Sequence, residues 1–243
     1  DQQQNITNMT LADIAEEAGV SEGSVVRFLN KLGIKKLIDL KLSIAKSAEE
    51  AHPAEGALSS VVEGEFTDVV HNTASLMDPG RLSRAVDLIE AGRQVYFFGV
   101  AVSGIAASTG ENSFIRMGKP VHAILEGHMQ MIAAAGMTEE DVVVVFSLTG
   151  NTRDTCEAAA LASQQGAKII SVTSYVNSQL ARISDVVLQT FAKEEIINGG
   201  RITGLVSQLY VLDCLKREYN KRNRDRTVRL KEEIGKVILS KKV

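Results

Sequence analysis

One short segment, residues 147–152 (SLTGNT), concentrates side chains of the type that bind phosphate. It follows an uncharged, mostly β-branched run at residues 142–146 (VVVVF), which predicts a strand buried on both faces, and it precedes a helical pattern over residues 153–165. A helix start offers free N–H groups and a positive dipole end, hydroxyls donate to phosphate oxygens, and glycine lets the backbone come close. The candidate ligand-binding residues of this segment are Ser147, Thr149, Gly150, Asn151 and Thr152. The alternative is that its three hydroxyl residues only cap the following helix.

A second hydroxyl-bearing turn follows an earlier predicted strand at residues 94–99 (QVYFFG), and it carries the candidates Ser103 and Gly104. Three further strands are predicted at residues 121–125, 167–173 and 186–189, with helical segments between them. Alternating strands and helices predict an α/β fold, a doubly wound parallel five-stranded sheet with helices on both faces. Ligands of such folds bind at the carboxyl ends of the strands, near the point where the strand order reverses. Two hydroxyl turns at that edge are harder to explain as helix caps alone than a single turn would be.

Composition excludes several classes of protein. The chain has 243 residues, of which 44% are hydrophobic and 23% charged, as in an ordinary globular protein. Aromatic residues make up 5% and Trp is absent, which argues against a stacking platform for bases or carbohydrates. The only cysteines, Cys156 and Cys214, lie in apolar helical contexts and are interpreted as buried packing residues in a reducing compartment, with no metal site. Without an apolar run of about 18 residues or a charged-then-apolar leader, we expect no membrane span and a cytoplasmic protein.

The net charge of −3 hides an uneven distribution. Residues 1–46 hold six basic and six acidic side chains, residues 216–243 hold eleven basic and four acidic ones, and residues 47–215 carry a net charge of −10. An acidic body does not attract nucleic acid through its general field. Any contact with DNA is therefore expected at one end of the chain.

Residues 11–31 (LADIAEEAGVSEGSVVRFLNK) have the spacing of a helix-turn-helix. Thr10 and Ser21 are the predicted N-caps of its two helices, and Gly19 and Gly33 are predicted to end them in tight turns. A small residue, Ala15, falls where the helices cross. The residues predicted to face inward are Ile14, Ala18, Val20, Val25 and Phe28.

The outward face of the second helix carries polar side chains that suit DNA. Arginine fits guanine edges or phosphate, asparagine fits adenine or phosphate, and serine fits the backbone. The candidate DNA-binding residues are Ser21, Ser24, Arg27, Asn30 and Lys31. The alternative is a helical hairpin used for packing or dimerisation. A domain of this kind needs a third helix in front, and only ten mostly polar residues precede residue 11, so we expect the segment to be incomplete at its N-terminus.

Four regions follow from these patterns. Residues 1–48 form the helix-turn-helix segment with a following helix, and residues 49–60, which contain Pro53 and Gly56, form a linker. Residues 61–215 form the α/β domain, and residues 216–243 form a basic C-terminal helix. The apolar stripe of that last helix is expected to pack on a partner subunit or on the helix of the linker region.

Three of these motifs are similar to those of a known domain. SLTGNT resembles the Ser-x-Ser-Gly-x-Thr phosphate loop of the SIS (sugar isomerase) domain, and FFGVAVSG resembles the first strand of that domain and its Gly-x-Gly-x-Ser turn. AKIISVTS with the later SQLA is similar to its following strand and turn. SEGSVVRFLNKLG is similar to the recognition-helix motif of the RpiR family of bacterial transcriptional regulators, which join a helix-turn-helix to a SIS domain. The resemblance covers nearly the whole chain.

The resemblance implies a phosphosugar-responsive, DNA-binding transcriptional regulator without a cofactor. Its partners would be a sugar phosphate, an operator DNA and further copies of itself, in a homodimer or homotetramer formed through the SIS domain. By position, the hydroxyls that match the phosphate contacts of the family are those of Ser103, Ser147, Thr149 and Thr152. The sequence departs from the family pattern at Ala101, which replaces a glycine, at Leu148, which replaces a polar residue, and at Thr149, which replaces a serine. The sugar is therefore not specified.

The alternative function is a sugar-phosphate isomerase or a related SIS-domain enzyme. Such an enzyme needs a general base, usually a Glu or His in the ligand cleft. The candidates are Glu111, Glu126, His128, Glu194 and Glu195, each of which can equally be a solvated surface group. None lies in a motif that demands catalysis, and a DNA-reading helix on the same chain favours a sensor that is not an enzyme.

Overall fold

The computed structural model describes residue 6 and residues 9–34, 36–51, 58–192 and 202–239. Contacts within the chain divide it into two units. The N-terminal unit comprises residues 1–64 with residues 193–201, and the α/β unit comprises residues 65–192 and 202–243. Helix α5 (Leu58–Leu76) contributes residues to both.

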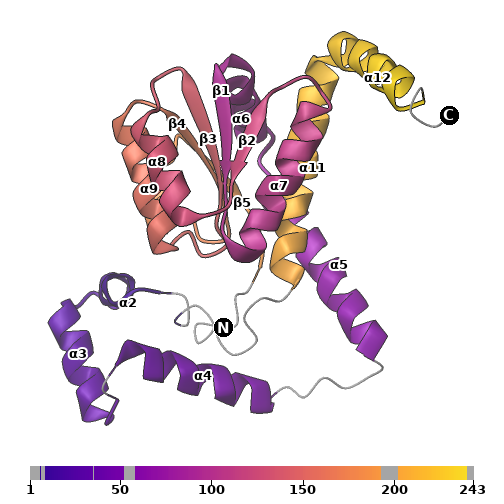
Figure 1. Ribbon diagram of the computed structural model, residues 1–243. Coiled ribbons are helices and arrows are strands. Elements are labelled where there is room, and N and C mark those ends of the chain that lie inside the picture. The colour runs from indigo at the N-terminus through magenta and orange to yellow at the C-terminus, as the bar shows by residue number, and fades with distance from the viewer. Residues whose placement is uncertain (1–5, 7–8, 35, 52–57, 193–201, 240–243) are drawn as a thin grey trace. The chain divides into compact units, whose positions relative to one another are not determined.

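The α/β unit is built on one five-stranded sheet with the strand order β2-β1-β3-β4-β5 (Figure 1). Every neighbouring pair in it is parallel. The strands are β1 (Gln94–Phe98), β2 (Val121–Ile124), β3 (Asp141–Phe146), β4 (Lys168–Thr173) and β5 (Val186–Gln189). The predicted parallel sheet is confirmed, and each strand end lies within one residue of its predicted place.

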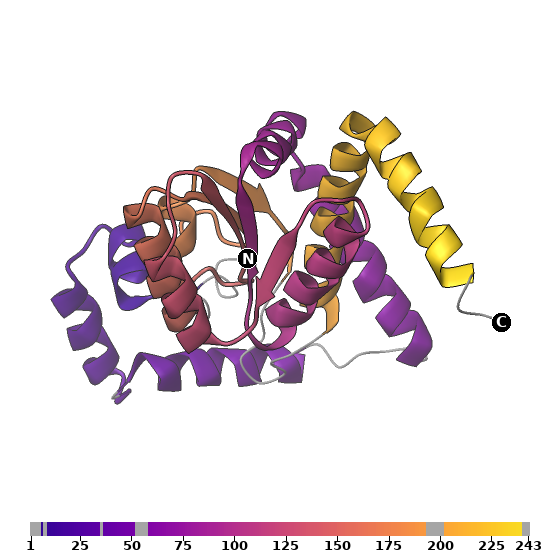
Figure 2. The same cartoon turned by 45° about the horizontal axis from the view of Figure 1, so that its top comes forward.

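Helices cover both faces of this sheet, as Figures 1 and 2 show. One face carries α6 (Pro79–Ala91), α7 (Ala101–Ile115) and α11 (Ile202–Arg222); the other carries α8 (Gly127–Ala135), α9 (Arg153–Gln164) and the short α10 (Gln179–Arg182). Strand β3 is buried along its whole length because its alternate side chains supply both cores. Val142, Val144 and Phe146 join the α6–α7–α11 core, whereas Val143 and Val145 join the α8–α9 core.

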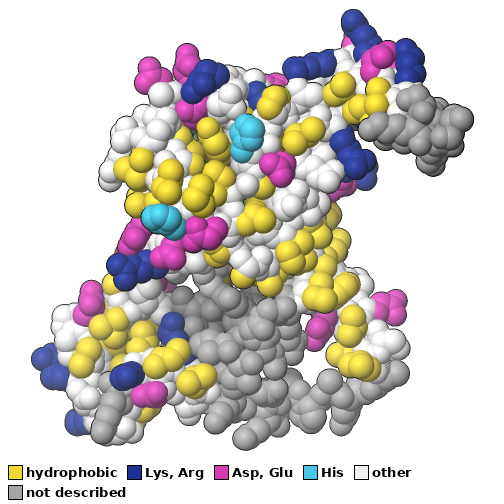
Figure 3. Space-filling model, in the orientation of Figure 1, with side chains coloured by type: hydrophobic (Ala, Val, Ile, Leu, Met, Phe, Trp, Pro, Cys, Tyr) yellow, Lys and Arg dark blue, Asp and Glu magenta, His cyan; other side chains and the backbone are white. Residues whose placement is uncertain are grey.

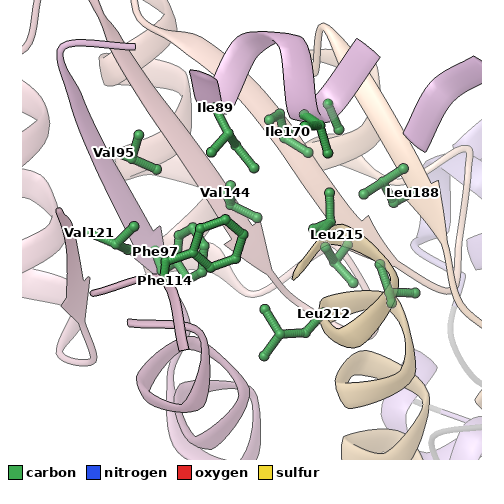
Figure 4. Close-up of a cluster of buried hydrophobic side chains, with 14 of the residues drawn as sticks. Ile89, Val95, Phe97, Phe114, Val121, Val144, Ile170, Leu188, Leu212 and Leu215 are labelled. Atoms are coloured by element: carbon green, nitrogen blue, oxygen red, sulfur yellow. The ribbon is translucent and has the colours of Figure 1, made fainter. Parts of the chain in front are cut away.

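Close packing of α7 on β1 fixes the position of the turn between them. The Phe97 ring of β1 meets Phe114 at a centroid distance of 5.5 Å and Phe146 at 5.7 Å, both edge to face, inside the core drawn in Figure 4. Gly110 of α7 lies directly over the same ring, since a Cβ built on it would be 2.3 Å from Phe97 Cε2. The absence of a side chain at Gly110 therefore lets α7 approach the strand closely.

The segment predicted as one basic helix, residues 216–243, is divided between two helices. Residues 216–222 belong to α11, and α12 (Arg224–Leu239) begins after a break at Asn223. The Asn223 side chain donates to the Tyr219 carbonyl at 3.0 Å and also contacts Glu90 of α6, and the Asn223 N–H donates to the same carbonyl at 3.0 Å. Within the described part of the chain, no helix is both long enough and apolar enough to cross a lipid bilayer.

The N-terminal unit contains the predicted helix-turn-helix as α2 (Leu11–Glu17) and α3 (Glu22–Lys31), followed by α4 (Leu37–Ala51). The capping box at Thr10 and the Ser21 cap are both present. Gly19 and Gly33 have φ angles of 64° and 74°, a region that favours glycine, so the predicted turns are confirmed. Residues 49–51 belong to α4 and residues 58–60 to α5, and the rest of the predicted linker, residues 52–57, lies outside the described residues.

Part of the predicted core of this unit is wrong. The buried cluster consists of Ala15, Val25 and Leu29, and the partly buried residues around it are Leu11, Ile14, Ile34, Leu37 and Leu40. Phe28 is 60% exposed, and Ala18 and Val20 are exposed as well. Val25 and Leu29 are four residues apart and define the covered side of α3, and Phe28 lies at the margin of that side, about 100° round the helix from Leu29, so burial of the first two does not bury it.

Candidate functional site

The two hydroxyl turns lie at the point where the strand order reverses. Strand β1 pairs with β2 on one side and with β3 on the other, so the connections that leave β1 and β3 run to opposite faces of the sheet. The turn after β1 leads into α7, and the turn after β3 leads into α9. The structure therefore brings the two predicted segments to the carboxyl edge where doubly wound folds bind their ligands.

Any other residue in place of Gly150 would force the loop after β3 to move. Its φ angle is +62°, and a Cβ built on it would be 2.1 Å from Ser178 Oγ and 2.8 Å from Thr173 Oγ1. The carbonyl of Gly150 accepts hydrogen bonds from the Leu180 N–H at 3.0 Å and from the Cys156 thiol at 3.2 Å. The loop is thus held against the start of α10 and against α9.

Two neighbours of Gly150 add to this scaffold. The Leu148 carbonyl accepts from the Thr173 hydroxyl at 3.1 Å and from the Ser174 N–H at 2.9 Å. The Asn151 side-chain oxygen accepts from the Gln179 N–H at 3.0 Å, so the amide nitrogen of Asn151 is the part of that side chain left as a donor. The loop is therefore fixed by residues of β4 and of the segment after it.

The hydroxyls of this loop accept hydrogen bonds from the protein. Ser147 Oγ accepts from the Gly150 N–H at 3.1 Å, and Thr149 Oγ1 accepts from the Asn151 N–H at 3.3 Å. Ser147 Oγ also lies 3.2 Å from Thr152 Oγ1. A hydroxyl has one hydrogen to donate and keeps it when it accepts. Thr149 can therefore donate to a ligand. Ser147 can donate a hydrogen bond to Thr152 Oγ1, and the Thr152 hydroxyl can then donate to a ligand.

The starts of α7 and α9 have no side-chain caps, in contrast to the other helices whose N-caps are described. The side chains that cap those other helices, α2, α3, α6, α8 and α10, are Thr10, Ser21, Asp78, Glu126 and Ser178. Val100 cannot cap α7, and Thr152 makes no cap bond to α9. The alternative in which the loop hydroxyls only cap α9 is therefore wrong. Two helices offer uncapped N–H groups at the same edge of the sheet, as an anion site requires.

The turn after β1 is a close approach of two backbone segments. A Cβ on Gly99 would be 2.5 Å from the Ser103 carbonyl oxygen, and one on Gly104 would be 3.2 Å from the Gly99 carbonyl oxygen. Ala101, at the first position of α7, has a φ of 49°, which is unfavourable for any residue with a Cβ. The glycine that the family pattern has here would relieve that strain.

Sequence reasoning missed a third element of the site, the first two turns of α11. Gly204 packs on the loop after β3, since a Cβ there would be 2.4 Å from Leu148 Cδ1. One turn further along α11, the Gln208 amide Nε2 donates to Ser103 Oγ at 3.0 Å. Ser103 is 9% exposed and Gln208 is fully buried. No local signal could have found Gln208, because its partner lies 105 residues earlier in the chain.

The candidate general bases have structural roles where they are described. Glu126 caps α8, and hydrogen bonds from the His128 and Met129 N–H groups lower the pKa of Glu126. Glu111 accepts from the Ala123 N–H of β2 at 3.0 Å, and the His128 side chain is exposed. Glu194 and Glu195 lie outside the described residues. Among the residues that the structure describes, no three His, Cys, Asp or Glu side chains come together as metal ligands.

The two cysteines are packing residues to different degrees. Cys156 is buried, and burial raises the pKa of its thiol to about 11. Cys214 is half-buried, and burial also raises the pKa of its thiol. Both thiols are therefore protonated at neutral pH, which makes them poor nucleophiles.

The predicted DNA-binding residues lie on one exposed stretch of α3. Ser21 Oγ accepts from the Ser24 N–H at 3.3 Å, and Ser24 Oγ accepts from the Arg27 guanidinium at 3.0 Å. Arg27, Asn30 and Lys31 are exposed. The two serines therefore cap α3 and hold Arg27, while three longer side chains face solvent from the same helix.

The fold defines a class: a doubly wound α/β domain with two uncapped helix starts at its switch point, on the same chain as a helix-turn-helix. The family comparisons agree. A model of the SIS domain matches residues 87–216, and a model of the helix-turn-helix domain of the rpiR family matches residues 1–51. The chain belongs to the rpiR family of helix-turn-helix transcriptional regulators that carry a SIS domain.

Known proteins resemble the chain over most of its length. It is 33% identical over 224 residues to the HTH-type transcriptional regulator HexR of Pseudomonas aeruginosa, covering 87% of this chain and 78% of HexR. The structure of the Vibrio vulnificus NanR protein complexed with ManNAc-6P has a TM-score of 0.84 at 22% identity, covering 99% of this chain and 94% of NanR. The C-terminal domain of an enzyme, glucosamine-fructose-6-phosphate aminotransferase from Francisella tularensis, has a TM-score of 0.53 at 21% identity, covering 69% of this chain and 51% of that one. At 22% and 21% sequence identity, the likeness to these last two structures shows a shared fold alone.

Proposed function

We propose that this protein is a phosphosugar-responsive transcriptional regulator, which binds a sugar phosphate at the switch point of its α/β unit and DNA through α3. The observation that carries the proposal is the pair of uncapped helix starts, α7 and α9, at the site where three hydroxyls accept hydrogen bonds from protein N–H groups. Such a site offers hydrogen-bond donors and two positive helix ends, and it is suited to a phosphate group.

The phosphate-binding residues of the proposal are those of the two turns. They are Ser103, Gly104, Ser147, Thr149, Gly150, Asn151 and Thr152. In the described structure, the hydroxyls would donate to phosphate oxygens and the glycines would let the backbone N–H groups come close. The bound ManNAc-6P of the NanR structure supports a sugar phosphate as the ligand class.

The DNA-binding part of the proposal rests on α3. Five residues would contact the operator: Arg27 and Asn30 would read base edges, and Ser21, Ser24 and Lys31 would contact the DNA backbone.

Two such helices must lie about one helical turn of DNA apart, so we propose a homodimer or homotetramer. Exposed apolar side chains of α7, of α8 and of the turn after β2 support contact with another subunit (Figure 3); they include Ile105, Ile115, Leu125, Met129 and Ile132. Such a regulator would work in the bacterial cytoplasm, where the DNA is.

We further propose that the protein does not convert its ligand. Glu111 and Glu126 are engaged by backbone N–H groups, and the lowered pKa of Glu126 makes that carboxylate a weaker base. NMR spectra of each bound sugar phosphate, incubated with an equal amount of protein, should show it unchanged. Formation of an isomer would favour the enzyme instead.

Isothermal titration calorimetry tests the phosphate site. The ligands are a panel of hexose and N-acetylhexosamine 6-phosphates, ManNAc-6P among them, each paired with its unphosphorylated sugar. At least one phosphate ester should bind much more tightly than its sugar. Thr149→Val, which removes only the hydroxyl, should weaken that binding by about tenfold or more, because a hydrogen bond to a charged group contributes about 1.5–3 kcal/mol.

A matched control keeps the test specific. Thr109 is an exposed threonine of α7 whose hydroxyl donates to the Ile105 carbonyl of its own helix at 2.7 Å. Thr109→Val should leave the affinity within twofold of the parent. Equal affinities for a sugar and its phosphate throughout the panel would refute the proposal.

A further inference from the structure

Gln208 of α11 has a property that packing does not explain. It is fully buried, and its amide Nε2 donates to Ser103 Oγ at 3.0 Å. The amide oxygen, Oε1, is also buried but has no hydrogen-bond partner within the described structure. A buried unpaired acceptor destabilises the folded state, whereas an apolar side chain of similar shape does not carry that penalty. Gln130 of α8 shares this unpaired oxygen, so it is the contact with Ser103 that links Gln208 to the proposed site.

The hydrogen bond from Gln208 determines how the Ser103 hydroxyl can act. The amide nitrogen is a donor only, so the Ser103 oxygen must accept, and the single hydrogen of that hydroxyl points elsewhere. Ser103 lies in the uncapped first turn of α7, at the edge where the proposed phosphate site is. Its hydrogen is thus available for an oxyanion, and accepting a bond from the amide makes the hydroxyl a stronger donor.

Helix α11 connects this hydroxyl to the second turn of the site. Gly204, one turn before Gln208, is in contact with Leu148 of the loop after β3. The Ser207 hydroxyl donates to the Gly204 carbonyl at 2.7 Å within the same turn. The same stretch of α11 therefore touches both phosphate-binding turns, and Gln208 is its polar contact with the turn after β1.

We propose that Gln208 is a positioning residue of the ligand site, which holds Ser103 as a hydrogen-bond donor and so raises the affinity for a doubly charged phosphate group. The inference rests on the proposed function, since it assigns a role at the same site. The role of Gln208 goes beyond the proposed function, because this residue lies outside both hydroxyl turns. Gln208 need not touch the ligand to have this effect.

A double-mutant cycle tests the role. The affinities of the parent, Ser103→Ala, Gln208→Met and the double variant are measured by calorimetry, with the phosphate ester that binds the parent most tightly and with inorganic phosphate. Ser103→Ala should weaken binding of the ester by about tenfold. Gln208→Met should weaken it by about threefold to tenfold, and the double variant should be no weaker than Ser103→Ala alone, because residues that act through one contact are not additive. Gln208→Leu, a second apolar replacement, should behave as Gln208→Met does.

Gln130 provides a matched control in the same unit. It is also a fully buried glutamine, its Nε2 donates to the Ile124 carbonyl at 2.8 Å, and its Oε1 has no partner in the described structure. Gln130→Met removes an equivalent amide without touching a hydroxyl of the site. It should leave the ligand affinity within twofold, and thermal unfolding of all variants confirms that they are folded.

The outcomes separate the inference from the proposed function. If the parent binds no phosphate ester, the proposed function fails and the inference falls with it. If Ser103→Ala weakens binding but Gln208→Met and Gln208→Leu bind as tightly as the parent or more tightly, only the inference is overturned. The inference is also overturned if the two effects add in the double variant, because Gln208 then does not act through Ser103.

Discussion

The proposed DNA-reading face of α3 and the proposed phosphate-binding turns of the α/β unit are held in place in opposite ways. Arg27 is exposed and is held by Ser24, three residues earlier in the same helix. Ser103 is buried and is held by Gln208, 105 residues later. The proposed DNA contacts are therefore local side chains on a helix surface, whereas the proposed ligand contacts are part of the packing of the domain.

The difference predicts which substitutions separate function from stability. A change on α3 removes a contact with DNA and leaves the fold intact, because the side chain contributes little to the core. A change in the loop after β3 alters ligand binding and stability together, since α9, α10 and β4 all hold that loop. Substitutions on α3 should therefore change DNA binding alone, whereas those in the loop after β3 should change both ligand affinity and the free energy of unfolding.

The largest effect is expected for Gly150→Ala. The added methyl group would be 2.1 Å from Ser178 Oγ, and the backbone has a φ of +62°. The loop must shift, so the free energy of unfolding should fall by about 3 kcal/mol or more, and ligand binding should be lost. Urea denaturation and calorimetry measure the two effects.

Gly235→Ala is the control for that substitution. Gly235 lies inside α12, and a Cβ on it would have no neighbour within 4 Å. Alanine should stabilise the helix by about 0.5–1 kcal/mol and leave ligand binding unchanged. A Gly150→Ala protein as stable as Gly235→Ala would show that the loop is not packed as described.

An intermediate effect is expected for Arg27→Ala. The loss of one good base contact costs about 1–3 kcal/mol of DNA-binding free energy, while the unfolding temperature and the ligand affinity should not change. Fluorescence anisotropy at fixed salt, with a DNA sequence that the protein selects from a random pool, measures the loss. Arg84→Ala, at an exposed arginine of α6, should bind that DNA as the parent does. If the two variants bind alike, α3 is not the reading helix.

The smallest effect is expected for Ala101→Gly. The φ of 49° costs a residue with a Cβ about 1–2 kcal/mol, and glycine loses about 0.5–1 kcal/mol through its greater freedom in the unfolded chain. The net result should be a stabilisation of up to about 1 kcal/mol, seen as a higher urea midpoint at an unchanged slope. Destabilisation by Ala101→Gly would mean that residue 101 is not strained.

The sequence predicted the elements whose signals are local. The buried strands, the Thr10 and Ser21 caps and the turns at Gly19 and Gly33 were placed correctly, whereas the Glu126 cap of α8 was not predicted. The two hydroxyl turns were expected at one sheet edge because parallel strands end there. Phe28 was placed in the core wrongly, since apolar character alone does not say which side of a helix is covered. Gln208 could not be predicted, because its role follows from a contact between α11 and α7 that no spacing in the sequence encodes. The break at Asn223, where the side chain contacts Glu90 of α6, was not predicted either.

In the proposed regulator, a phosphate ester bound in the α/β unit changes DNA binding by the N-terminal unit. The most direct measurement is the DNA affinity of the parent with and without a saturating sugar phosphate, compared with Ser147→Ala at the same concentrations. We expect a change of about 5-fold to 150-fold in the parent, in either direction, as is typical of coupled sites, and a much smaller change for Ser147→Ala. An unchanged DNA affinity in the parent, at concentrations where calorimetry shows the site to be filled, would contradict it.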